Sequence, residues 1–111
     1  MERNEKKLPE HFVRFRQMNP EVSEAFEELG RRVYESGPLS DRERRLVKLA
    51  IAVGVNSEGA VHSAVRHALA GGCSHEDIGH TVRLAITTLG WPRAQAAMSW
   101  AIDLFDETGP R

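Results

Sequence analysis

The stretch that decides the fold covers residues 56–72 and reads N-S-E-G-A-V-H-S-A-V-R-H-A-L-A-G-G. Small and apolar side chains dominate it, and they recur at the spacing of one helix face. Asn56 or Ser57 suits the start of a helix. Gly71 and Gly72 suit its end, because glycine readily takes the left-handed conformation that closes a helix. We therefore predict a largely buried helix that packs through Val61, Ala64, Val65, Ala68 and Leu69.

The segments on both sides of this helix also have helical spacing. No segment shows the period-two alternation that is typical of strands. A stripe at Val22, Phe26, Leu29 and Val33 predicts an amphipathic helix that begins at Pro20. We expect further helices that begin at Pro9, after Ser40, after Ser74 and at Trp91, the one after Ser74 continuing to Gly90. The fold class is all-α, a compact bundle of five or six helices.

Two of these helix starts have the capping-box pattern, in which a serine precedes an acidic residue by three positions. Ser40 with Glu43 forms one pair, and Ser74 with Asp77 forms the other. Glu43 could alternatively face the same turn as the start of the 56–72 helix. The capping role suffices to explain it.

Length and composition restrict the class of protein. With 111 residues, we expect one domain over 9–108 after a flexible N-terminus at 1–8. A formal net charge of −1 gives no reason to expect nucleic acid or a membrane surface as partner. The single cysteine, Cys73, excludes an intramolecular disulfide and fits a cytoplasmic setting. We see no secretory leader and no apolar run long enough to span a bilayer.

The candidate catalytic residues are Glu58 and His62, which lie one helical turn apart on the same face. A carboxylate beside an imidazole orients the ring, as a general base requires. The alternative is an exposed pair that contributes only a few tenths of a kcal/mol to stability. The small residues around the pair favour a buried position and hence the catalytic interpretation.

Metal binding and thiol chemistry are two further possibilities for the same region. Glu58 and His62 could supply two metal ligands, but a third ligand would have to come from elsewhere in the chain. We expect neither a metal nor an organic cofactor. Cys73 lies at a helix junction, where a thiol can be activated. An inert, small apolar role is the alternative that we favour for it.

Three stretches carry a resemblance to a known family. They are L-S-D-R-E-R-R-L-V-K-L-A-I-A-V-G at 39–54, E-G-A-V-H-S-A-V-R-H-A-L-A-G-G at 58–72 and S-H-E-D-I-G-H-T-V-R-L-A-I-T-T-L-G-W-P-R-A at 74–94. In order and character they resemble the carboxymuconolactone decarboxylase-like family, which includes the alkylhydroperoxidase D-like proteins. The resemblance implies an all-α fold of that type and a homo-trimer or homo-hexamer. It also implies one of two activities, because members of the family are either decarboxylases of lactones or peroxidases with a C-x-x-C motif.

The peroxidase residues of that family do not carry over to this chain. Its two cysteine positions fall on Ser57 and Ala60, its histidine on Ala64 and its proton-relay glutamate on Arg45. No partner thiol exists, so a disulfide-cycling peroxidase is excluded. Glu58 matches an acidic position of the decarboxylase branch, whereas His62 lies two residues before the histidine of that branch.

Three functions remain open from the sequence. The first is a lyase or proton-transfer enzyme for a small organic acid or lactone, with Glu58 and His62 as catalytic residues and Arg45 or Arg66 receiving the substrate carboxylate. The second is a non-catalytic oligomeric scaffold or ligand-binding protein. The third is a peroxidase that uses Cys73 alone.

Overall fold

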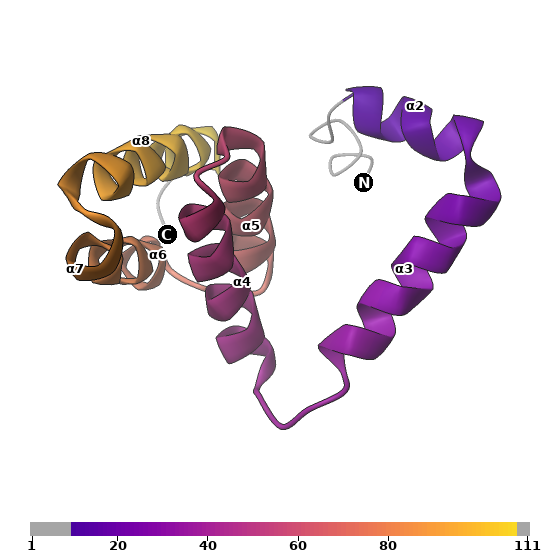
Figure 1. Cartoon of the computed structure of the whole chain (residues 1–111), viewed down its shortest axis with the longest axis horizontal. Coiled ribbons are helices and arrows are strands. Elements are labelled where there is room, and N and C mark those ends of the chain that lie inside the picture. Colours follow the sequence, from indigo (N-terminus) through magenta and orange to yellow (C-terminus); the bar gives the residue numbers. More distant parts are fainter. Residues whose placement is uncertain (1–9, 109–111) are drawn as a thin grey trace. The chain divides into compact units, whose positions relative to one another are not determined.

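A computed structural model describes residues 10–108, and every secondary-structure element within them is a helix (Figure 1). The predicted all-α fold class is therefore confirmed. The predicted flexible segment 1–8 and the predicted helix start at Pro9 lie outside the described residues. Among the described residues, no helix has both the length and the apolar character that crossing a bilayer requires.

The chain divides into two compact units, residues 1–38 and 39–111. The first unit contains α2 (Glu10–Met18) and α3 (Pro20–Tyr34), and α3 begins at the predicted proline. Neither helix buries a residue. The predicted apolar stripe of α3 is present, but its side chains are exposed, by 57–68% of their surface. The single-domain organisation over 9–108 stays a prediction.

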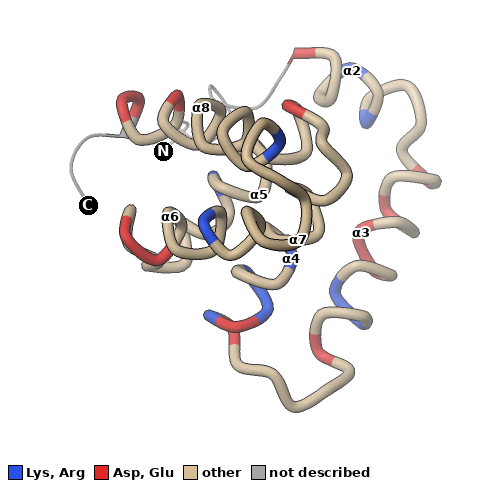
Figure 2. Tube along the Cα trace, turned by 60° about the vertical axis from the view of Figure 1, so that its left-hand side comes forward, with Lys and Arg blue, Asp and Glu red and all other residues tan. Residues whose placement is uncertain are grey.

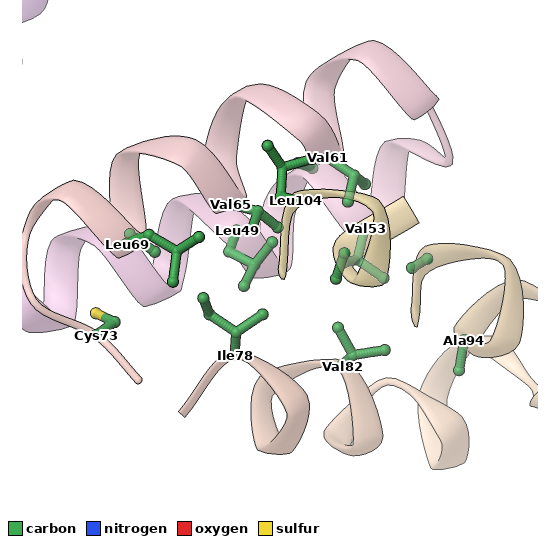
Figure 3. Packing of buried hydrophobic residues seen from close by; sticks show 14 residues of the cluster. Leu49, Val53, Val61, Val65, Leu69, Cys73, Ile78, Val82, Ala94 and Leu104 are labelled. Atoms are coloured by element: carbon green, nitrogen blue, oxygen red, sulfur yellow. The ribbon is translucent and has the colours of Figure 1, made fainter. Parts of the chain in front are cut away.

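The second unit contains the helices α4 (Asp41–Val55), α5 (Glu58–Ala70), α6 (His75–Leu84), α7 (Ile86–Leu89) and α8 (Trp91–Thr108). The hydrophobic core lies among all of these helices except the short α7. Figure 3 shows side chains from α4, α5, α6 and α8 meeting in one cluster. The largest of its fully buried side chains are Leu49, Ile78, Val53, Val61, Val65, Val82 and Cys73. The predicted helix at 56–72 is thus α5, and it is packed as expected.

Both predicted capping boxes are present. The backbone N–H of Glu43 donates to Ser40 Oγ at 3.1 Å, and the N–H of Ser40 donates to Glu43 Oε1 at 2.8 Å. Ser74 and Asp77 repeat this arrangement at 2.9 Å in both directions. Each box satisfies two backbone donors that a helix start would otherwise leave unpaired. Glu43 is therefore occupied at the start of α4.

The end of α5 explains the position of the cysteine. The N–H of Cys73 donates to the carbonyl of Ala68 at 3.0 Å, and the N–H of Gly72 donates to the carbonyl of Leu69 at 3.0 Å. Gly72 has a φ of 93°, so this is a Schellman motif. The residue that follows the glycine in such a motif packs back on the helix, and Cys73 is 1% exposed.

The predicted uninterrupted helix between Ser74 and Gly90 is wrong in one respect. It divides at Ala85 into α6 and the single turn α7. The N–H of Ala85 bonds to Val82 and the N–H of Thr88 bonds to Ala85, both with three-residue spacing. Such bonds tighten the backbone locally and end the α-helical ladder. Gly90 then stops α7 with φ 96° and ψ 160°, a conformation that only glycine adopts readily.

Candidate functional site

The candidate site begins at the turn between α4 and α5. Asn56 ends α4 in the left-handed conformation with a φ of 64°. Ser57 then caps α5, because its Oγ accepts the N–H of Ala60 at 3.2 Å. Glu58 is the first residue of α5, where the helix dipole favours a negative charge. Ser57, at the position of the family's first cysteine, therefore has a structural role here.

Three ionisable side chains meet at this end of α5. Nε2 of His62 lies 3.0 Å from Oδ2 of Asp103 on α8 and 3.9 Å from Oε2 of Glu58. The C-terminal part of α8 passes beside the first turns of α5 (Figure 1). The side chain of His62 is 24% exposed, whereas those of Glu58 and Asp103 are 59% and 57% exposed. The site is a half-buried imidazole beneath two exposed carboxylates.

The two carboxylates act on the imidazole in different ways. Asp103 is within hydrogen-bonding distance of Nε2 and fixes the orientation of the ring. Glu58 lies beyond that distance and contributes mainly its charge. Glu58 and His62 therefore lie near each other as the helix spacing predicts, but the predicted burial of the pair is wrong for Glu58, which is 59% exposed. The closest partner of His62 is a third residue, Asp103. Asp103 is the group best placed to orient His62.

Sequence reasoning missed Asp103 because it lies 41 residues after His62. The only local signal was an acidic residue between two apolar ones on an Ala-rich helix. Ala101 and Leu104 are 0% and 2% exposed, so they fix which side of α8 faces the core. That periodicity places Asp103 at the edge of the buried face, but it does not indicate which neighbouring helix is in reach.

Arg66 lies one turn after His62 on α5, in the direction away from Glu58. Its Nε atom is buried, and within residues 10–108 it has no hydrogen-bond partner. A guanidinium with such an unpaired donor can take an anionic group. Of the two predicted substrate-binding residues, Arg45 and Arg66, only Arg66 lies on α5 near His62.

Arg45 lies at the other end of α5. Its Nε donates to Oδ2 of Asp41 at 2.8 Å, and its Nη1 donates to the backbone carbonyl of His67. From Glu58 to His67 the helix rises by about 13 Å. The structure therefore does not bring Arg45 to Glu58. Arg45 instead ties α4 to the last turn of α5, and it lies so close above Gly71 that a side chain there would displace it.

The nearby His67 lies in an environment that disfavours its protonated form. The pKa of His67 is lowered from its ordinary value, first by loss of solvent around the ring and then by the charges of Arg45, Lys48 and Arg66. The neutral form of this histidine is favoured. His67 therefore does not supply a positive charge for a substrate anion.

Cys73 has the opposite environment from that of a reactive thiol. It is buried, and its pKa is raised, first by burial and then by the negative charge of Asp77. A raised pKa disfavours the thiolate, which is the nucleophilic form. The side chain thus fits the inert, apolar role.

Comparison with known proteins identifies the family. The model of the carboxymuconolactone decarboxylase family matches residues 20–103, well over half of the chain. This chain belongs to the carboxymuconolactone decarboxylase family. No curated protein sequence matches it significantly.

A solved structure agrees with this assignment. The chain resembles a carboxymuconolactone decarboxylase family protein from Legionella pneumophila, solved in its apo form, with a TM-score of 0.74 and 23% sequence identity. The similarity covers 87% of this chain and 86% of the other. At this level of identity, it supports the fold and not a shared reaction.

Proposed function

We propose that this family member is an enzyme in which His62 transfers a proton to or from a small organic acid or a lactone. The observation that carries the proposal is the hydrogen bond of 3.0 Å between Nε2 of His62 and Oδ2 of Asp103. A half-buried imidazole held by a carboxylate is the arrangement that general acid–base catalysis uses. Glu58 adds a second negative charge near the same nitrogen.

The groups that are present support a proposed reaction class. As a base, His62 would take a proton from the carbon next to a carbonyl, and the electron pair of that C–H bond would move toward the carbonyl oxygen. In loss of a carboxylate, carbon dioxide leaves its bonding pair on the neighbouring carbon, and the imidazolium returns a proton there. Asp103 compensates the positive charge that the ring carries between these steps.

Arg66 is the residue that we propose for binding the substrate carboxylate. It follows His62 by one turn of α5, and the unpaired Nε provides a buried donor. Arg45 has no part in this proposal, because it is bound at the far end of α5.

The test compares turnover of candidate lactones and keto acids by the wild type and by His62→Gln. Loss of a general acid or base lowers turnover by about 100-fold or more. The matched control is His80→Gln, which alters an exposed histidine of α6 outside the site. Equal turnover by His62→Gln and the wild type would remove His62 from the mechanism.

A non-catalytic ligand-binding or scaffold protein is the second candidate. It is favoured by the exposure of Glu58 and Asp103, which is more than half of each side chain. In this case the folded wild type would turn over none of the candidate substrates, while still binding an organic acid.

The third possibility, a peroxidase that uses Cys73, is disfavoured by the burial and raised pKa of that thiol. Peroxide would have to reach a side chain that is 1% exposed. A single-thiol peroxidase requires an accessible thiolate, which this position does not offer.

Self-association forms part of the proposal. The exposed apolar side chains of α3, together with Trp91 of α8 at 61% exposure, are of the kind that oligomer interfaces cover. We propose a homo-trimer or homo-hexamer in a cytoplasmic setting, with no nucleic-acid or membrane partner. Light scattering on the purified protein measures the assembly directly.

A further inference from the structure

We infer that Glu58, His62 and Asp103 together bind a divalent transition-metal cation such as Zn²⁺. The regulatory part of this inference rests on the proposed function, because a cation at His62 would affect the proposed proton transfer. The binding itself does not depend on that function.

The distances between the ligand atoms fit such a cation. Nitrogen and carboxylate ligands lie about 2.0–2.2 Å from zinc, so two ligands in a tetrahedral site are about 3.4 Å apart. Here Nε2 of His62 is 3.0 Å from Asp103 and 3.9 Å from Glu58, and all three ligand atoms lie within 4.8 Å of one another. The side chain of Glu58 is 59% exposed, so it has room to rotate toward such a cation.

The kinds of ligand restrict the metal. One imidazole nitrogen with two carboxylate oxygens suits Zn²⁺, Mn²⁺, Fe²⁺ and Co²⁺, whereas Mg²⁺ and Ca²⁺ prefer oxygen alone. The three protein ligands leave at least one coordination position for water or for an external anion.

The charges at the site also favour a cation. Glu58 and Asp103 place two negative charges around one imidazole, which can offset at most one of them. Within residues 10–108, no other cation lies within ion-pair distance of either carboxylate. A divalent cation would offset both charges at once, at a position where like charges otherwise repel.

The backbone that presents the three ligands is held by the core. Val61 and Val65 flank His62 on α5 and are fully buried, and Ala101 and Leu104 flank Asp103 on α8 with at most 2% exposure. Rigid helices hold ligands more accurately than loops do. The third ligand that Glu58 and His62 lacked on α5 therefore comes from a fixed position on α8.

A cation at Nε2 of His62 would replace the hydrogen bond to Asp103 on which the proposed proton transfer depends. Because Nε2 faces both carboxylates, the nitrogen left to exchange a proton with a substrate is Nδ1. A cation on Nε2 places positive charge on the ring and uses the charge of Asp103 for itself, and both effects make Nδ1 a weaker base. Metal binding would therefore inhibit the proposed proton transfer, and a chelator would restore it.

The test is a titration of chelator-treated, full-length protein with Co²⁺, followed by its visible absorption, and with Zn²⁺, followed by calorimetry. The variants are Glu58→Gln, His62→Gln and Asp103→Asn. The matched control is Asp106→Asn, which alters another exposed carboxylate one turn further along α8. Mg²⁺ serves as the control for non-specific attraction to acidic groups.

We expect one cation per site in the wild type and in Asp106→Asn, and an affinity at least about tenfold weaker in each of the three ligand variants. Wild type that gives no cobalt spectrum, or that binds Co²⁺ no more tightly than His62→Gln does, would overturn the inference. If His62→Gln does not fold, the exposed Asp103→Asn decides in the same way. The titration contains no substrate, so it tests metal binding separately from proton transfer. A failure to bind metal would leave the proposed proton transfer intact, and a failure of proton transfer would leave the metal site intact.

Discussion

His62 of α5 and Asp103 of α8 form a hydrogen bond of 3.0 Å although 41 residues separate them in the chain. Their neighbours Val61 and Leu104 are buried in the same core, so the packing of the two helices brings the two side chains together (Figure 3). The bond thus depends on the tertiary structure.

We predict that Asp103→Asn lowers turnover of an accepted substrate more than Glu58→Gln does. An amide still fills the space of the carboxylate but cannot compensate a positive charge on His62, whereas Glu58 lies beyond hydrogen-bonding distance. The pH profile of turnover checks this, because a residue that acts through His62 shifts the profile. Equal losses and unchanged profiles in both variants would contradict an orienting role for Asp103.

We predict that Ser40→Ala and Ser74→Ala each lower the free energy of unfolding by about 1 kcal/mol. Both serines accept a backbone N–H in a capping box, and the alanine leaves that donor unpaired. Ser99→Ala is the control, since its exposed hydroxyl donates only to the carbonyl of Ala96 within α8. Denaturant unfolding measures the difference, and a loss as large in the control would refute the capping argument.

We predict that Leu49→Ala lowers the free energy of unfolding by about 2–5 kcal/mol. Leu49 is 0% exposed at the centre of the core, and its removal leaves a cavity among α4, α5 and α6 (Figure 3). Val47→Ala on the same helix is the control, because Val47 is 45% exposed. Thermal and denaturant unfolding should separate the two variants clearly.

We predict that His67 reduces stability in mildly acidic solution. Its folded pKa lies below the ordinary value of 6.5, so the unfolded chain takes up the proton first as the pH falls. Stability is therefore unaffected by this group above that pH and decreases below it. The measurement is the difference in unfolding free energy between wild type and His67→Gln from pH 8 to pH 5, which should change in favour of the variant on acidification. A difference that stays constant over this range would contradict the prediction.

We predict that the thiol of Cys73 is alkylated slowly in the folded protein and rapidly in denaturant. Burial both raises its pKa and blocks access. The rate of alkylation against pH provides the measurement. Rapid alkylation of the folded protein with an apparent pKa clearly below that of an unperturbed cysteine, about 8.5, would speak against this assignment and reopen the peroxidase.

The pattern of charges on the surface is only partly explained by residues close together in the sequence. Figure 2 shows acidic residues at the first turn of α6 and along the last turns of α8, and mixed charges at the start of α4. The acidic first turn of α6 follows from helix-start chemistry and was predictable from Ser74 and Asp77. The acidic end of α8 follows no such rule, and its role at the site depends on what lies beside it.

By itself, the sequence determined the all-helical character of the described residues, the capping boxes at Ser40 and Ser74, a glycine end of α5 at Gly71 and Gly72, and the shared helix face of Glu58 and His62. All of these depend on residues within a few positions of each other, where backbone geometry sets the outcome. Only the tertiary structure decided that Asp103 is the nearest partner of His62, that Arg45 lies at the far end of α5 and that the helix after Ser74 breaks at Ala85. The first two outcomes depend on how the helices pack against one another, and the spacing of apolar residues along a single helix does not specify its neighbour. The break at Ala85 coincides with local hydrogen bonds of three-residue spacing, which the apolar pattern does not reveal.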